Sequence, residues 1–185
     1  MLYSDLTEAI GHTPMIELRR LNPNPAVKIF AKLEGFNPTG SLKDRIVKYM
    51  IERAEASGEL TPDKILLEPT SGNTGIAYAM IAAAKGYKTL LAVPENVSTG
   101  KKKLLTSYGA ELLLTDPLEG SDGSSLVIQE LYDKSPEQYF YPSRVVPLPG
   151  KSRRPDPCHY HNPINRHQNP WSLYSIFHLI HHGHG

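Results

Sequence analysis

The sequence predicts an α/β protein with an open parallel sheet and helices on both faces, followed by an irregular C-terminal tail. Three observations lead to this prediction. Over residues 1–141, short apolar runs alternate with helix-like stretches of about 10 to 15 residues, a spacing typical of βαβ units. Glycine or proline stands at most of the junctions. After residue 141 the alternation stops, and proline and histidine become frequent.

The first predicted strand covers residues 27–33, where apolar and polar residues alternate. The sequence Asn-Pro-Thr-Gly at residues 37–40 ends this part of the chain. From residue 41 to 57 apolar side chains recur at helical spacing, and Gly58 follows as a stop signal. This pattern predicts an amphipathic helix.

The rest of residues 1–141 continues the alternation of predicted strands and helices. Strands are predicted at residues 65–67, 89–93, 111–115 and 139–141, and helices at residues 75–85, 98–108 and 122–134. Parallel strands need crossover connections, and ligands bind in the loops at the carboxyl ends of such strands. We therefore expect the loops of residues 37–43 and 69–73 to lie at the same edge of the sheet.

Composition excludes several classes of protein. Among 185 residues, 20 Lys and Arg against 19 Asp and Glu give a net charge of +1, which argues against a nucleic acid or an anionic membrane as partner. Cys158 is the only cysteine, so a disulfide framework and a thiolate zinc site are excluded. No apolar run approaches the ~18 residues of a membrane span, and no signal peptide is recognisable. We expect a cytoplasmic protein.

The chain divides near residue 141 into two kinds of sequence. Residues 142–185 hold seven of the eight histidines, seven of the 16 prolines and a single acidic residue, Asp156. We expect residues 1–141 to form the folded region and residues 142–185 to be poorly ordered, and we hypothesise a shifted reading frame or a truncated gene. The tail histidines could bind a divalent cation, but without a further defined ligand we predict no metal site.

The loop of residues 37–45 places a lysine at a predicted helix start. The positive end of the helix dipole disfavours an ammonium ion at Lys43 and favours the neutral amine, which is the form that attacks a carbonyl carbon. Lys43 is therefore a candidate for Schiff-base chemistry, with an ordinary exposed lysine as the alternative. Asp44 and Arg45 are interpreted as first-turn and surface charges.

The loop of residues 68–75 reads Glu-Pro-Thr-Ser-Gly-Asn-Thr-Gly. Its small residues expose several backbone N–H groups before a helix, which suits a bound carboxylate or phosphate. The alternative is ordinary helix capping by Asn73 or Thr74, with Gly72 and Gly75 serving the turn. No P-loop and no G-x-G-x-x-G motif is present, so nucleotide binding has no specific support.

Several motifs occur together in the order and spacing of one enzyme family. They lie at residues 10–14, 32–34, 37–45, 68–75 and 108–112. On these motifs the chain resembles, over roughly residues 4–141, the cysteine synthase and cystathionine β-synthase family of pyridoxal-phosphate-dependent enzymes, which have the tryptophan-synthase-β type fold.

The resemblance implies a role for each loop. Lys43 resembles the catalytic lysine that binds pyridoxal 5'-phosphate covalently and moves the α-proton of the substrate, and Asn73 the residue that hydrogen-bonds the ring oxygen of the cofactor. The α-carboxylate of the amino-acid substrate would be bound by Thr70, Ser71, Gly72 and Thr74. The implied reaction is a β-replacement, in which sulfide displaces the leaving group of O-acetylserine or O-phosphoserine to give cysteine. Members of the family are commonly homodimers.

Two contacts of the family are not recognisable in this sequence. They are a glycine- and threonine-rich loop around the cofactor phosphate and a side chain that meets the pyridine nitrogen, both supplied by a second domain. Two functions therefore stay open: a cysteine-synthase-like transferase or lyase with impaired or absent activity, or an inactive fragment that only binds a partner or another subunit. A metal-binding tail is a third reading, which rests on histidines alone.

Overall fold

A four-stranded parallel sheet forms the centre of the molecule. The computed structural model describes residues 2–24, 26–70 and 72–145. The strand order is β5-β4-β3-β6, and every neighbouring pair is parallel. The strands are β3 (Ile65–Pro69), β4 (Lys88–Pro94), β5 (Glu111–Thr115) and β6 (Tyr139–Phe140). The predicted α/β class is confirmed.

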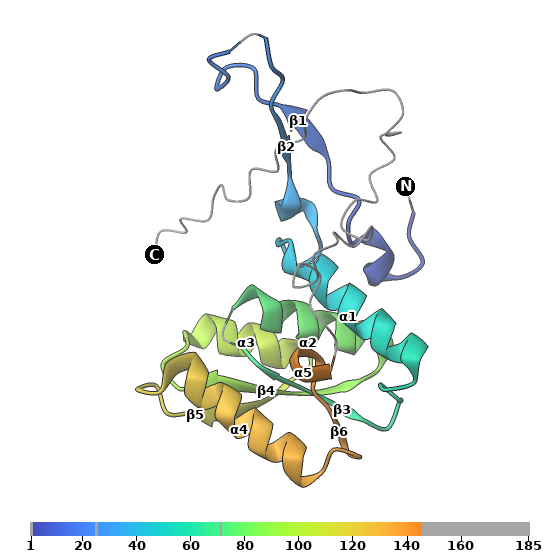
Figure 1. Cartoon of the computed structure of the whole chain (residues 1–185), viewed down its shortest axis with the longest axis vertical. Coiled ribbons are helices and arrows are strands. Elements are labelled where there is room, and N and C mark those ends of the chain that lie inside the picture. Colours follow the sequence, from blue (N-terminus) through green and yellow to red (C-terminus); the bar gives the residue numbers. More distant parts are fainter. Residues whose placement is uncertain (1, 25, 71, 146–185) are drawn as a thin grey trace.

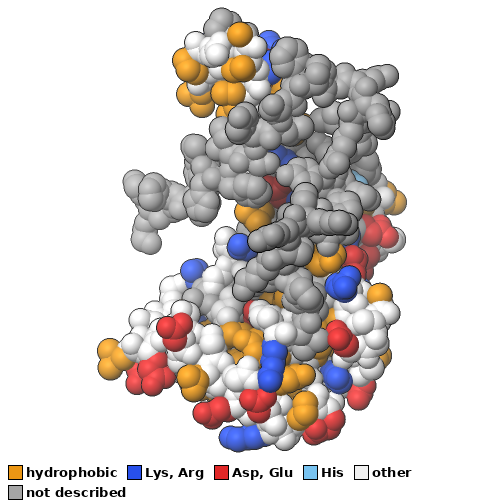
Figure 2. All heavy atoms as spheres, viewed as in Figure 1, with side chains coloured by type: hydrophobic (Ala, Val, Ile, Leu, Met, Phe, Trp, Pro, Cys, Tyr) orange, Lys and Arg blue, Asp and Glu red, His pale blue; other side chains and the backbone are white. Residues whose placement is uncertain are grey.

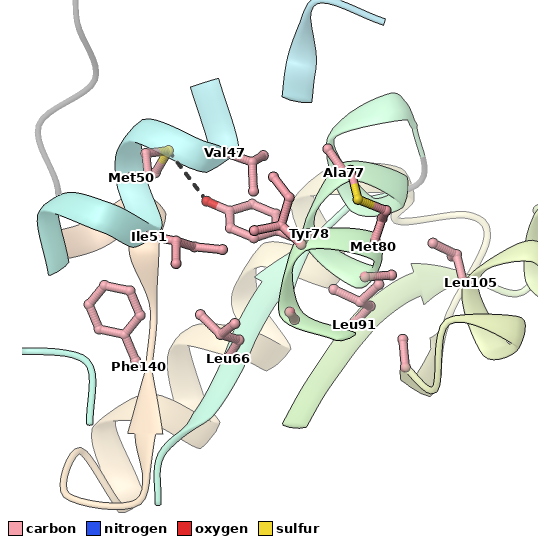
Figure 3. Packing of buried hydrophobic residues seen from close by; sticks show 14 of the residues in the cluster. Val47, Met50, Ile51, Leu66, Ala77, Tyr78, Met80, Leu91, Leu105 and Phe140 are labelled. Carbon is pink, nitrogen blue, oxygen red and sulfur yellow. Dashed lines mark hydrogen bonds between the residues drawn. The ribbon is translucent and has the colours of Figure 1, made fainter. Parts of the chain in front are cut away.

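Helices cover both faces of this sheet, as predicted (Figure 1). On one face lie α1 (Lys43–Ser57), α2 (Asn73–Lys85) and α3 (Thr99–Ser107), and on the other lies α4 (Gly120–Lys134). Successive strand residues point to opposite faces, so Leu66 joins the apolar cluster beneath α1 and α2, while Leu67 joins Ile128 of α4 in a second cluster. Figure 3 shows Leu66 and Leu91 in the larger cluster, below Tyr78 of α2.

The predicted helix ends agree closely with the structure. Gly58 and Gly86 follow α1 and α2 with φ of +75° and +80°, a left-handed conformation that glycine adopts without a steric penalty. Ser98 caps α3 with a side chain that accepts the Lys101 N–H. The strand predicted at residues 111–115 coincides with β5.

The strand predicted at residues 27–33 does not belong to the parallel sheet. Only Phe30–Lys32 forms β2, and it pairs antiparallel with β1 (Met15–Glu17) in a separate two-stranded ribbon. The alternation of side chains indicates a strand but carries no information about its partner. Short 3-10 helices precede and follow this ribbon, at Leu6–Ala9 (η1) and Glu34–Phe36 (η2).

The surface of the ribbon differs from that of the sheet domain. Figure 2 shows hydrophobic side chains gathered at the tip of the ribbon, where Leu21 and Val27 are exposed. Charged side chains of both signs are scattered among polar and hydrophobic ones over the lower part in the same view. No helix in the described part of the chain is long and apolar enough to cross a membrane.

The start of the predicted tail is helical. Pro142–Val145 forms the short helix α5, which packs against β3 and α1. The other residues of the predicted tail, 146–185, lie outside the described residues, and so do the expectations of poor order and of histidine chemistry there.

Candidate active site

Lys43 is the first residue of α1, two residues after a hydroxyl that fixes its backbone. The Lys43 N–H donates a hydrogen bond of 3.0 Å to Oγ of Ser41, a residue that is itself buried. The Lys43 side chain is half-buried, and its amine has no hydrogen-bond or ion-pair partner among the described residues. A half-buried primary amine without a partner is available for covalent chemistry with a carbonyl group.

Asp44 is fully buried, so its interpretation as a surface charge was wrong. Its Oδ2 accepts the Thr39 N–H at 2.8 Å, and its Oδ1 accepts the Thr39 hydroxyl. Burial raises the pKa of Asp44 above its ordinary value, although the two hydrogen bonds from Thr39 oppose the shift. Its partner is four residues before Lys43, and the sequence pattern gave no sign of this contact.

Arg45 was also expected at the surface, and instead it joins three parts of the chain. Its guanidinium binds Glu34 at 2.7 Å, the carbonyl oxygen of Gly11 at 2.7 Å and Oγ1 of Thr13 at 2.8 Å. Asn37 completes the network, with an amide group that donates to Glu34 and accepts the Gly11 N–H. Burial favours a higher pKa for Glu34, but the hydrogen bonds from Arg45 and Asn37 outweigh it and hold the pKa below its usual value.

Thr70 organises the loop that leads into α2. Its Oγ1 accepts the Gly75 N–H at 3.1 Å, and its own N–H continues the ladder to the carbonyl oxygen of Ala92. Gly75 is required at this contact, because a Cβ there would lie 2.5 Å from Cγ2 of Thr70. The N-cap of α2 is Gly72, so capping by Asn73 or Thr74 was wrong, and the Thr70 hydroxyl supplies the acceptor instead.

Asn73 and Thr74 form the first turn of α2 and leave their side chains available. Asn73 is exposed and Thr74 is half-buried, and neither side chain hydrogen-bonds within the described ranges. Gly72 is half-buried, and a Cβ built on it would meet nothing within 4 Å. Ser71, the remaining predicted substrate contact, lies outside the described residues.

The packing of α1 against α2 brings the two loops to the same end of the molecule. The helices run side by side in the same direction (Figure 1). Met50 of α1 accepts a hydrogen bond of 3.3 Å from the hydroxyl of Tyr78 in α2 (Figure 3). Further toward the C-terminal ends of the same helices, Glu55 forms an ion pair with Lys85. Because the two helices run in the same direction, both of their N-terminal ends, and the loops before them, lie at the same end of the pair. The expectation that both loops follow strands of the parallel sheet was wrong, since β2 pairs only with β1 in a separate ribbon.

Glu68 is a buried group at this edge that sequence reasoning did not single out. It lies at the end of β3, where Oε1 accepts the Ser143 hydroxyl at 2.6 Å and buried Oε2 has no partner among the described residues. Burial raises the pKa of Glu68 to about 7, against the opposing hydrogen bond from Ser143. Tyr78 and Tyr141 are close enough for their pKa values to respond to its charge. The sequence signal that could have identified Glu68 is its position directly after three apolar strand residues.

No metal centre accompanies these groups. Within residues 2–24, 26–70 and 72–145, no three His, Cys, Asp or Glu side chains gather around a common point.

Comparison with known proteins decides the family. The pattern described as pyridoxal-phosphate dependent enzyme matches residues 6–147. The chain belongs to this family. A cysteine synthase of Aquifex aeolicus is 45% identical over 139 residues, covering 74% of this chain and 42% of that protein.

Solved structures of the family agree with the fold. A cysteine synthase from Entamoeba histolytica superposes with a TM-score of 0.73 at 34% identity, covering 78% of this chain and 44% of that one. An O-acetylserine-dependent cystathionine β-synthase from Helicobacter pylori gives a TM-score of 0.68 at 37% identity, covering 77% of this chain and 47% of that one. The chain thus spans less than half the length of these relatives. Membership of the family implies pyridoxal phosphate as the cofactor.

Proposed function

We propose that this chain carries the lysine-bearing part of a cysteine-synthase-like enzyme, with Lys43 as the residue that binds pyridoxal phosphate. The observation that carries the proposal is Lys43 itself, a half-buried residue at the first position of α1 whose amine is unpaired among the described residues. The family match over residues 6–147, which includes both loops, and the 45% identity to a cysteine synthase over 139 residues support the same assignment.

The described residues fit such a cofactor by their chemistry. Lys43 offers a primary amine for its aldehyde, and Asn73 offers an exposed amide that makes no other hydrogen bond in the described part. The amide would bind the ring oxygen. When bound, pyridoxal phosphate stabilises negative charge at the α-carbon of an amino acid. The Lys43 amine, once free, is the group of this chain that would take or return the α-proton.

The loop after β3 is suited to the substrate carboxylate. Thr70 uses Oγ1 as an acceptor for backbone N–H groups, so its hydroxyl hydrogen is still available to donate to an anion. The hydroxyl of Thr74 and the open backbone at Gly72 add further donors, as Ser71 would. We propose an α-amino acid with an activated β-carbon as substrate, in agreement with the sequence-based expectation.

The names of the relatives are the basis for proposing particular substrates. One relative is named a cysteine synthase and another an O-acetylserine-dependent enzyme. We therefore propose O-acetylserine over O-phosphoserine as the substrate and sulfide as the second substrate. The homodimer of the family is proposed for this chain as well, and sedimentation of the purified protein tests it.

The deciding experiment measures covalent binding of the cofactor. The purified chain is titrated with pyridoxal phosphate, the adduct is reduced with borohydride, and its site is mapped by mass spectrometry. We expect one saturable adduct on Lys43, its loss in Lys43→Ala, and its retention in the control Lys103→Ala, because Lys103 is exposed on α3. An adduct that forms equally in Lys43→Ala refutes the proposal.

A second step separates the two functions that the sequence left open. A chain that forms the adduct and makes cysteine from O-acetylserine and sulfide is an enzyme. A chain that forms the adduct without turnover is a cofactor-binding fragment.

A further inference from the structure

The backbone around Lys43 is fixed on both sides by side chains of its own loop. Ser41 accepts the Lys43 N–H, and the next residue, Asp44, binds Thr39 with both carboxyl oxygens. The Gly40 N–H donates to the carbonyl oxygen of Asn37 at 2.8 Å, which tightens the same turn. The main chain of Lys43 is therefore held by neighbouring groups, while its amine has no partner among the described residues.

Asp44 is an unusual group for a purely structural contact. It is completely buried, and a buried carboxyl is costly unless hydrogen bonds compensate. No ion pair of the described residues includes Asp44, and the negative charge of Glu34 adds to the rise of its pKa. Its partners are the two polar groups of Thr39, so the group closes the loop around Lys43 and does not neutralise the Lys43 amine.

We propose that Asp44 is a positioning residue, which holds the loop of residues 39–44 closed and so fixes the direction in which the Lys43 amine leaves the start of α1. The proposal rests on the proposed function of Lys43. An amine held in one direction reacts faster with a bound carbonyl group, because the orientation is fixed before the reaction begins. The hydroxyl of Thr39, which donates to Asp44, helps to hold the loop in the same way.

Three variants test the two hydrogen bonds. Asp44→Leu keeps a side chain of similar shape that accepts no hydrogen bond, so both bonds from Thr39 are lost. Thr39→Val removes only the hydroxyl bond. Thr39→Ser keeps both bonds and is the conservative control.

Three rates are measured on each variant. Amide exchange of residues 39–44 should rise about tenfold in Asp44→Leu and Thr39→Val, while the amides of α2 are unchanged. Reductive methylation of Lys43 by formaldehyde, relative to Lys103, should rise several-fold, because the loosened side chain becomes more accessible. Formation of the pyridoxal-phosphate adduct should instead slow by about tenfold. Thr39→Ser should match the original chain in all three.

The opposite changes of the two reactions distinguish positioning from loss of fold. A purely structural contact would change exchange but leave the adduct rate unaltered, and that result overturns the proposal. Equal methylation and exchange in the original chain and Asp44→Leu also overturn it. If the original chain forms no adduct, the proposed function fails, while methylation and exchange still decide whether Asp44 holds Lys43 in place.

Discussion

Glu68 combines deep burial with an oxygen, Oε2, that no described residue binds. The pKa of Glu68 is about 7 in the folded chain, against an ordinary value of 4.5. At a pH below 4.5, Glu68 is protonated in both the folded and the unfolded chain. Between the two values only the folded chain holds the proton, so the free energy of unfolding falls as the pH rises.

This linkage gives a testable pH dependence. From pH 4.5 to 7 the stabilisation from protonated Glu68 should decline by on the order of 3 kcal/mol. Glu68→Gln should not show this decline. Urea unfolding at a series of pH values measures the difference, with Glu111→Gln as the control, because Glu111 is exposed on β5. A difference between Glu68→Gln and the original chain that stays constant with pH would contradict the assignment.

Asp44 and Arg45 mark what the sequence could not predict at the level of single residues. Both were interpreted as surface charges, because a charged residue in the first turn of a helix usually faces water. Asp44 is buried against Thr39, and Arg45 is partly buried against Glu34 and Gly11, partners that the helix pattern does not reveal. Residue type and position at a helix start made Lys43 only a candidate with an exposed lysine as the alternative, and its predicted role came from the family resemblance.

The start of α2 is fixed by a close contact between Thr70 and Gly75. Gly75→Ala places a Cβ 2.5 Å from Cγ2 of Thr70, and rotating that side chain away would break its hydrogen bond to the Gly75 N–H. We expect a net loss of about 1–3 kcal/mol in the free energy of unfolding, measured with urea.

A second substitution tests the cause of that loss. Thr70→Ser removes Cγ2 and keeps Oγ1, so Gly75→Ala should cost much less in this background. Gly72→Ala should be tolerated, because nothing lies within 4 Å of its Cβ position. An equal cost of Gly75→Ala in both backgrounds would show that Cγ2 is not responsible.

Helices and strands of the main sheet were predictable, and the ribbon was not. The apolar periodicity and the stop signals at Gly58 and Gly86 define α1 and α2 locally. β1 is only three residues long and was missed, and β2 was assigned to the wrong sheet. The partner of β2 is determined by packing between distant segments, and local sequence patterns carry no information about that packing.

At the scale of the whole molecule, one sheet separates two apolar clusters. Leu66 and Leu67 are both buried, on opposite faces, with α1 and α2 on one side and α4 on the other. Because every strand contributes to both faces, we expect the described region to unfold as one cooperative unit.

Truncation on either face tests this cooperativity. Leu66→Ala and Leu67→Ala should each lower the free energy of unfolding by about 2–5 kcal/mol without changing the slope against urea. Fluorescence and circular dichroism should give coincident transitions in both variants. A separate early transition in Leu67→Ala would indicate that the α4 face unfolds independently.

The strand order β5-β4-β3-β6 also sets the sequence of events in folding. Ile65 of β3 pairs with Lys88 of β4 after one crossover, but its other neighbour, Tyr139, arrives only after β4, β5 and α4. Closing the longer loop costs more chain entropy, so β6 should join after the other three strands have assembled. Until then β3 is an open edge with unpaired backbone groups, and a growing or refolding chain is exposed there to pairing with the wrong strand.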